Sequence, residues 1–204
     1  MIEETLRTEF EALKNDFEII RQQIESDVVR TELYKGEFYE LTPYSYQRHG
    51  FRQGKPVKRP DTVKNTKNLC IYGFNNQNQI VEVKVGCSIE NQFYHTFLYY
   101  TDNLVKSILY DNGKHLMNVC HYFFEGGKLK RSQLCGRYGC REENYIYKEN
   151  ALTHIEVKQY DIEGNSGNDL IHIFQYQDDG TLETITKSFP NGYSEIIYKT
   201  KRGC

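Results

Sequence analysis

Cysteine and histidine are the residues in this sequence whose spacing best suggests chemistry. Cys135 and Cys140 flank the stretch Gly-Arg-Tyr-Gly, and Cys120 stands directly before His121. Thiolate and imidazole groups are preferred zinc ligands, and structural zinc sites usually show tightly spaced pairs. Neighbouring side chains on a strand point to opposite faces, so Cys120 and His121 are not expected to share a metal. We therefore predict no metal site and no cofactor, with the thiols packed as small apolar groups.

A second candidate for metal binding is the acidic stretch from Asp161 to Asp169, in which Asp161, Glu163 and Asn165 alternate with other residues as in a calcium loop. An EF-hand loop requires glycine at its sixth position and glutamate at its twelfth. Ser166 and His172 occupy those two positions here. The sequence therefore favours an ordinary polar loop.

Catalytic signatures are missing from the sequence. It contains no GxSxG, HExxH, phosphate-binding loop or dinucleotide glycine fingerprint. Several histidines fall on predicted strands, but spacing identifies neither a nucleophile nor a partnered carboxylate for them. We therefore predict no catalytic residues and a protein that is not an enzyme.

Composition narrows the choice of partners and location. The 204 residues include 26 basic and 28 acidic side chains, a net charge of −2 that favours neither nucleic acid nor a membrane. No apolar run is long enough to span a bilayer, and no secretory signal precedes the first charged residues. The expected location is cytoplasmic, where thiols stay reduced. This expectation covers all six cysteines: Cys70, Cys87, Cys120, Cys135, Cys140 and Cys204.

The elements that position these residues follow a repeated pattern. An aromatic or aliphatic residue is followed four positions later by Gly or Asn and then, two further on, by an aliphatic residue. Gly and Asn enter positive φ most easily, which short hairpin turns require. Spacings of ~23–30 residues are typical of repeat proteins. The matches are Phe74-Asn78-Ile80, Tyr99-Asn103-Val105, Phe123-Gly127-Leu129, Ile146-Asn150-Leu152 and Tyr176-Gly180-Leu182.

This pattern predicts an α+β, mostly β fold, in which an N-terminal helix packs on a long, twisted antiparallel β-meander of about ten hairpin-connected strands. Further turns are expected at Asp111-Asn112-Gly113 and Pro190-Asn191-Gly192. The strands are expected near 69–75, 79–87, 92–101, 104–111, 117–125, 128–135, 142–148, 151–161, 169–177, 181–189 and 193–200.

Three segments are predicted: a helical segment 1–35, a basic irregular linker 36–68 and the β-meander domain 69–201. The helical segment carries one apolar stripe with spacings of four and three residues. The stripe either lies on the sheet, which we favour, or forms a homodimer seam. Its members are Leu6, Phe10, Leu13, Phe17, Ile20 and Ile24.

Tyrosine is enriched, with 17 Tyr and no Trp. A helix can cover only part of one sheet face, so we expect an exposed aromatic surface of the kind that binds other proteins. The predicted partner-binding residues are Tyr94, Tyr100, Tyr122, Tyr145, Tyr147 and Tyr176.

The repeats also resemble two known types. Tyr176-Gln-Asp-Asp-Gly180-Thr-Leu182 is similar to the YD repeat of bacterial toxin shells. Phe123-Phe-Glu-Gly-Gly127-Lys-Leu129 and Tyr110-Asp-Asn-Gly113 look like the MORN-variant repeat of bacterial antitoxin proteins. The resemblance covers 69–201 and implies a non-catalytic immunity protein that occludes a cognate toxin through its sheet.

Two other functions remain open. An enzyme or effector acting on RNA or another phosphate-rich substrate could use the basic segment 48–67 for guidance, although nucleic acid is the less favoured partner. The basic residues proposed for it are Arg48, Arg52, Lys55, Lys58 and Arg59. Alternatively, the meander could close on itself around a small apolar ligand.

Overall fold

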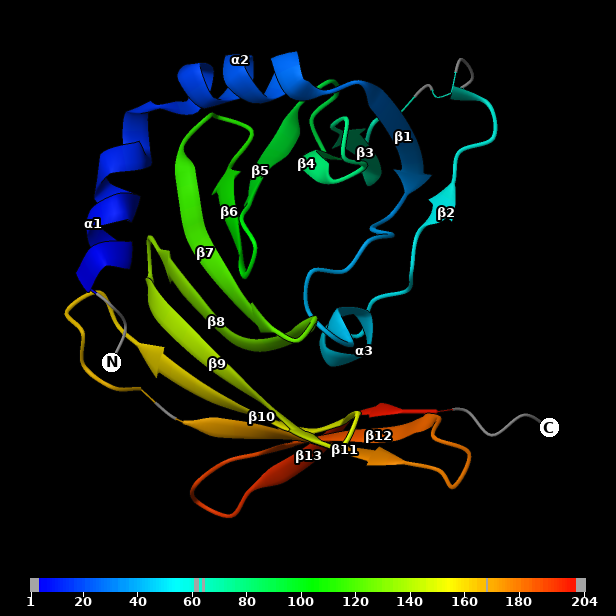
Figure 1. The fold of residues 1–204 in the computed structure, drawn as a ribbon, viewed down its shortest axis with the longest axis vertical. Helices are drawn as coiled ribbons and strands as arrows, with labels where there is room; N and C mark the ends of the chain where they lie inside the picture. Colours follow the sequence, from blue (N-terminus) through cyan, green and yellow to red (C-terminus); the bar gives the residue numbers. More distant parts are fainter. Residues whose placement is uncertain (1–3, 61–62, 64, 168, 201–204) are drawn as a thin grey trace.

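Antiparallel pairing joins every strand of the protein into one sheet (Figure 1). The computed structural model describes residues 4–60, 63, 65–167 and 169–200. Within them the N-terminal elements are α1 (Glu4–Ala12), the 3-10 turn η1 (Leu13–Asn15), α2 (Phe17–Asp27), β1 (Arg30–Lys35), α3 (Ser45–His49) and β2 (Lys55–Pro56). The remaining strands are β3 (Leu69–Phe74), β4 (Ile80–Gly86), β5 (Phe93–Tyr100), β6 (Leu104–Tyr110), β7 (Leu116–Glu125), β8 (Lys128–Gly136), β9 (Gly139–Lys148), β10 (Ala151–Tyr160), β11 (Leu170–Tyr176), β12 (Leu182–Ser188) and β13 (Ser194–Lys199).

The sheet contains thirteen described strands in the order β13 to β3, then β1, then β2. The prediction of an α+β, mostly β fold built on an antiparallel meander is confirmed, and β3 to β13 lie within three residues of their expected bounds. The sequence pattern missed β1 and β2. β1 pairs with both β2 and β3, and a long connection rather than a short hairpin turn separates it from each, so hairpin spacing carries no signal for it.

The hairpin turns show where the predicted pattern applies. Gly127 and Gly180 adopt φ of +75° and +81°, and Asn78 adopts +60°, as expected. In two other turns the left-handed residue is a neighbour of the expected one: Lys114 at φ +65° and Glu149 at +56°. A turn therefore forms at each repeat, but the residue that bears the positive φ varies, and neither Asp102 nor Asn103 of the β5–β6 turn adopts positive φ.

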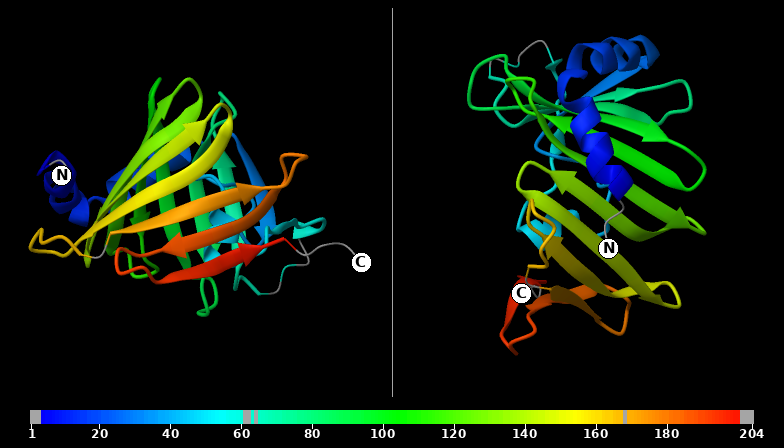
Figure 2. Two further views of the ribbon diagram at one scale, coloured as in Figure 1. Left: turned by 90° about the horizontal axis from the view of Figure 1, so that it is seen from below. Right: turned by 90° about the vertical axis from the view of Figure 1, so that its left-hand side faces the viewer.

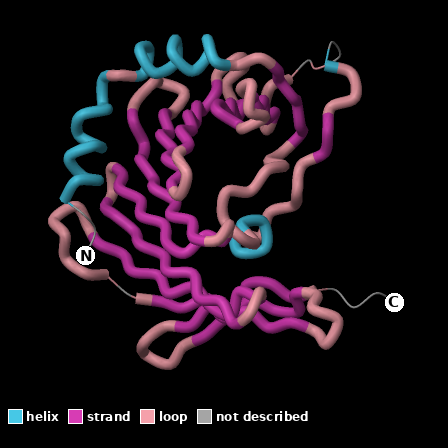
Figure 3. Tube along the Cα trace, viewed as in Figure 1, coloured by secondary structure: helices cyan, strands magenta, loops and turns pink. Residues whose placement is uncertain are grey.

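The sheet curls strongly, which gives it two unlike faces (Figures 1 and 2). We call the face covered by α1 and α2 convex, and the inner face concave. The connection from β1 to β2, mostly loop in Figure 3, runs along the concave face and includes α3. β2 and β13 stand at opposite ends of the strand order, and α3 packs against β13. The described sheet is therefore open, with α3 bridging its ends.

The convex core is formed by the predicted helical stripe. Five of its six members are buried, and Leu13 packs against the same cluster. The interpretation of a helix lying on the sheet is confirmed, and the stripe is used within the chain instead of facing a second copy. The sheet residues in this cluster are Val81, Phe97, Ile108, Tyr110, Leu116, Val119, Cys135 and Cys140.

The N-terminal helical segment is shorter than predicted and is broken. η1 separates α1 from α2, and the Tyr110 hydroxyl donates a hydrogen bond of 2.7 Å to the Leu13 carbonyl at this break. The expectation of helix to about residue 34 is wrong, because α2 ends at Asp27 and the Arg30–Lys35 stretch is β1. Pairing with β2 and β3 on its two sides outweighs local helix propensity there.

The concave side holds two more clusters. One gathers buried residues of β8 to β12, with Tyr44 of the connection packed against them. The other joins Tyr34 of β1 to Cys70, Tyr72 and Phe74 of β3. None of the described helices is long and apolar enough to cross a membrane.

Candidate functional site

All six predicted partner-binding tyrosines lie on the concave face. In β5, Phe97 packs under α2 on the convex side, so the alternating residues Tyr94 and Tyr100 point inward. Tyr94 stands opposite Val85, which faces the same side. The other four share the concave clusters or the cavity described below: Tyr122, Tyr145, Tyr147 and Tyr176.

The connection from β1 to β2 covers part of this tyrosine face, and several of the tyrosine hydroxyls are already hydrogen-bonded within the sheet. Tyr145 is 2% exposed and its hydroxyl donates to Glu143. The hydroxyls of Tyr100 and Tyr176 each donate a 2.8 Å hydrogen bond to a backbone carbonyl. Tyr94 is 37% exposed, whereas the other five tyrosines are buried or half-buried. Binding of a partner by these tyrosines stays a prediction, and Tyr145 is placed as a core residue.

Arg48 lies inside the molecule, in contrast to its expected place on a basic surface. Its Nη2 donates to Glu143 Oε1 at 2.7 Å, and its Nε donates to His172 Nδ1 at 3.1 Å. The Arg48 side chain is 2% exposed and that of Glu143 is 9% exposed. The inclusion of Arg48 in a phosphate-binding surface is therefore wrong: its charge is used to fix α3 to β9 and β11.

The electrostatics of this cluster favour one arrangement of charges. Burial raises the pKa of Glu143, but Arg48, Arg141 and the Tyr145 hydroxyl outweigh burial and lower it to about 2. Burial, followed by the nearby Arg48 charge, lowers the pKa of His172 to about 3. Glu143 is thus ionised and His172 neutral near pH 7. Because both groups are buried, the cluster is suited to holding α3 in place rather than to meeting a substrate.

A cavity of about 640 Å³ opens on the concave face between the connection and β3 to β7. Its floor is aliphatic, from Ile80, Val83, Val85 and Leu98, and its aromatic walls are Tyr39, Tyr72, Phe74, Tyr100 and Tyr122. Glu32, Glu37 and Glu40 line its rim. Sequence reasoning found two of these aromatics, Tyr100 and Tyr122. It missed the site because β1 and the connection, which form one wall, carry no repeat.

At the cavity rim, the lining binds the positively charged guanidinium of Arg30. Its guanidinium carbon lies 3.8 Å from the centre of the Phe74 ring, Nη1 pairs with Glu32, and Nη2 donates to Asn78 Oδ1 at 2.6 Å. An aromatic face beside a carboxylate is a favourable environment for a guanidinium or ammonium group. Burial raises the pKa of Glu32, but hydrogen bonds from Tyr39, Tyr34 and Arg30 lower it overall.

Beyond the ends of β9 and β10 at Cys140 and Tyr160, which pack against α1, the convex face of β9 to β13 is not covered by α1 or α2 (Figure 2, left). This uncovered face carries exposed isoleucines. Ile146 pairs with His154, His154 with Ile173, Ile173 with Thr186, and Thr186 with Ile196. Ile171 lies two residues before Ile173 on the same side. We name the four isoleucines the isoleucine surface; their exposed fractions are 39% for Ile146, 40% for Ile171, 41% for Ile173 and 61% for Ile196.

The sequence of β11 contained a signal for the isoleucine surface, which the prediction based on tyrosine did not use. β11 reads Leu-Ile-His-Ile-Phe, with Leu170, His172 and Phe174 buried and the two isoleucines exposed. A strand that is apolar on both faces predicts an apolar surface wherever no second layer covers it. The expected open face was aromatic, whereas the exposed apolar side chains described here are isoleucines on the convex side.

The other candidate chemistry of the sequence is dispersed. The His121 ring pairs with Glu9 of α1 at 2.8 Å on the convex face, whereas the next residue back, Cys120, is buried facing the other way. Asp161 accepts hydrogen bonds from the backbone N–H groups of Glu163 and Asn165, which makes a tight polar turn. Among the described residues no group of three or more His, Cys, Asp or Glu is arranged to hold a metal.

The remaining residues of the predicted basic segment, Arg52, Lys55, Lys58 and Arg59, are exposed in or near β2. They lie at the opposite end of the strand order from the isoleucine surface. Their use in binding phosphate stays a prediction.

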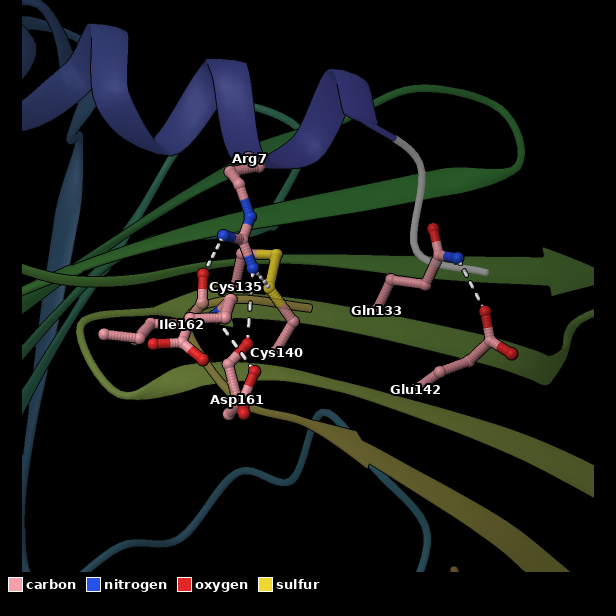
Figure 4. The surroundings of a disulfide bond; sticks show 8 residues. Arg7, Gln133, Cys135, Cys140, Glu142, Asp161 and Ile162 are labelled. Carbon is pink, nitrogen blue, oxygen red and sulfur yellow. Dashed lines mark hydrogen bonds between the residues drawn. A yellow bond between two sulfur atoms is a disulfide. The ribbon is translucent and has the colours of Figure 1, made fainter. Parts of the chain in front are cut away.

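The expectation that every cysteine is reduced is wrong for one pair, because Cys135 and Cys140 form a disulfide (Figure 4). The β8–β9 hairpin places them directly opposite each other, with a Cα–Cα distance of 4.2 Å. Two cysteines that flank a four-residue turn therefore face the same side, which the close spacing alone could have indicated. Cys70, Cys87 and Cys120 are unpaired thiols, and Cys204 lies outside the described residues.

Comparison of the chain with protein-family models, curated proteins and solved structures gave no match. The resemblance to YD and MORN-variant repeats therefore stays a prediction. Function must be inferred from the surfaces described above.

Proposed function

We propose that the protein is a non-catalytic binding protein that engages a protein partner through the isoleucine surface. The observation that carries this proposal is the exposure of four isoleucines on one uncovered sheet face, three of them aligned across β9 to β13. Exposed apolar side chains that gather on one uncovered face are typical of sites of protein interaction. The resemblance of the repeats to antitoxin proteins supports a toxin as the partner.

The rigidity of the sheet supports the same proposal. The isoleucines lie on strands whose backbone is fixed by pairing on both sides, except in the edge strand β13. A surface that is already formed binds with little ordering cost. The paired neighbours of Ile146, Ile173 and Ile196 on this face, His154 and Thr186, carry no fixed negative charge, whereas Ile171 pairs with Glu156 and Ser188 at the border of the surface.

The test is differential capture from the native host. Ile173→Asp should weaken binding of the true partner by about 2 kcal/mol or more, which is roughly 30-fold in Kd. Ile19→Asp is the matched control, because Ile19 is 69% exposed on α2, away from this surface. A protein that is retained by the wild type and by the control, and lost by Ile173→Asp, is the partner. Circular dichroism checks that both variants fold.

Equal capture by Ile173→Asp, Ile196→Asp and the wild type would contradict the proposed surface. Tyr94→Ala and Tyr100→Ala then test the tyrosine face that the sequence predicted. If the captured protein inhibits growth when expressed alone, co-expression shows whether this chain neutralises it. A partner without such toxicity would contradict the immunity role while leaving the binding surface in place.

Binding of a small ligand is a second candidate function, favoured by the cavity on the concave face. Its volume of about 640 Å³ and its aliphatic and aromatic lining are typical of ligand pockets. The acidic rim favours a positively charged group over an anion. Leu98→Trp should fill the floor, so thermal stabilisation by a hydrophobic amine should disappear in that variant. Equal stabilisation by the matched carboxylic acid would contradict this candidate.

A further inference from the structure

The disulfide lies at the base of a pocket beside α1. Cys135 and Cys140 belong to the convex core and are 1% and 7% exposed. Both line a pocket of about 400 Å³, together with Arg7, Phe10, Lys14 and Arg137 among others. The pocket therefore defines the side from which a small molecule approaches these two buried cysteines.

Arg7 gives the pocket its unbalanced charge. Lys14 pairs with Glu11 at 2.5 Å, and Arg137 pairs with Asp111 at 3.3 Å. Within the described part of the chain, Arg7 makes no ion pair: it donates to the carbonyls of Asp161 and Ile162 and points toward the disulfide (Figure 4). Its Nη2 lies 3.7 Å from Cys140 Sγ.

We propose that the Cys135–Cys140 disulfide is a thiol-exchange site, which a small anionic thiol reaches through this pocket. The two observations that carry the proposal are the pocket that both cysteines line and the Arg7 guanidinium beside Cys140 Sγ. A cation at this distance attracts an anionic reactant and stabilises a thiolate.

The geometry assigns a role to each sulfur. The thiolate of the incoming thiol attacks Cys135 Sγ and forms a mixed disulfide, while the S–S bond breaks and its electron pair leaves on Cys140 Sγ. That thiolate forms next to Arg7, which lowers its energy and makes Cys140 the better leaving group. A second thiol then attacks the mixed disulfide and releases Cys135 as a thiol. The protein gains two electrons and two protons, and two small thiols become one disulfide.

The two buried free cysteines, Cys70 and Cys120, are poorly suited to this reaction. Burial raises the pKa of the Cys70 thiol to about 11 and that of the Cys120 thiol to about 12. Little thiolate is present at neutral pH in either, and the thiolate is the reactive form. Exchange should therefore be confined to the Cys135–Cys140 pair and to the more exposed Cys87.

The experiment uses the full chain with Cys87→Ser and Cys204→Ser, oxidised in air. Mixed-disulfide formation is followed by intact mass and peptide mapping with mercaptoethanesulfonate, mercaptoethanol or cysteamine, which are anionic, neutral and cationic thiols. After correction for thiolate fraction, the anionic thiol should react roughly 10-fold faster than the cationic one. Arg7→Gln should remove this preference, whereas Arg52→Gln, at an exposed site on the connection, should retain it.

Equal corrected rates for the three thiols would overturn the proposal, as would an unchanged preference in Arg7→Gln. Isolation of Cys135 and Cys140 as free thiols after oxidation would also overturn it. If Arg7→Gln does not fold, the wild-type protein still tests the proposal. A preference for the anionic thiol that is caused by charge must decrease as salt is added, because salt screens charges. A preference that is independent of salt would count against the proposal.

Discussion

At the scale of single residues, Arg48 shows how the fold changes the meaning of a charge. In the sequence it begins a basic run, whereas in the structure its guanidinium is enclosed between Glu143 and His172. Such a pair contributes little net stability compared with an apolar replacement, but loss of one partner leaves a buried charge without compensation. This difference can be measured.

Arg48→Ala should destabilise the protein by about 3 kcal/mol, the lower end of the range for breaking a buried ion pair, because ionised Glu143 would remain buried with only Arg141 and the Tyr145 hydroxyl as partners. Arg52→Ala, at an exposed position four residues later, should change stability by less than about 0.5 kcal/mol. Urea denaturation measures both values. The double variant Arg48→Ala/Glu143→Gln should cost less than the sum of the single variants, and simple additivity would contradict the coupling.

His172 makes stability depend on pH. Its pKa of about 3 in the folded protein lies below its ordinary value of 6.5, so the unfolded chain binds a proton first as the pH falls. Stability should therefore decrease from pH 6.5 downward, by at most about 1.4 kcal/mol per pH unit from this group. Between pH 6.5 and 5, His172→Gln should flatten the dependence measured by urea denaturation. An unchanged slope would contradict the assignment.

At the scale of elements, the turns test which residue bears the strain. Glu149 has φ +56° in the β9–β10 turn, whereas the repeat pattern pointed to Asn150. Because left-handed backbone costs a side-chain-bearing residue ~1 kcal/mol or more, Glu149→Gly should stabilise the protein by about 0.5–1 kcal/mol. Asn150→Gly should bring no such gain. Thermal and urea denaturation compare the two, and the reverse ranking would show that the repeat interpretation was right at this turn.

The docking of α2 allows a matched comparison of neighbouring residues. Ile20 is 6% exposed in the convex core, and Ile19 is 69% exposed on the same helix. Ile20→Ala should cost about 2–5 kcal/mol through lost burial and the cavity that remains. Ile19→Ala should be close to neutral, because helix propensity offsets the small loss of contact. Similar costs for both variants in urea denaturation would contradict the packing of α2.

Elements that depend on local sequence signals were predicted well, and features that depend on long-range pairing were predicted poorly. The hairpin strands and the helical stripe follow from periodicity and turn residues, which act over a few positions. β1 depends on a partner strand nearly forty residues later, and the disulfide depends on hairpin register. The tyrosines were assigned to a surface because sequence does not reveal that the connection, through Tyr44 and α3, lies over the concave face.

At the scale of the whole molecule, coverage of the sheet is uneven. α1 packs over β7 and β8, whereas β13 is an edge strand with no helix on its convex face. Backbone amides in β7 and β8 should exchange with deuterium far more slowly than those of β13, since opening an edge requires less of the core to separate. Hydrogen exchange with mass spectrometry tests this ranking. Slower exchange in β13 than in β7 would indicate that another chain covers the edge.

The contacts of α1 also affect the order in which the chain can fold during synthesis. The partners of residues 4–12 lie in β7 and β8, which are complete only when residue 136 has been made. At roughly 5–20 residues per second, the apolar stripe of the first helix leaves the ribosome several seconds before the strands that will cover it. The apolar stripe of α1 must therefore remain unassembled, and open to chaperones, until β7 and β8 have been made.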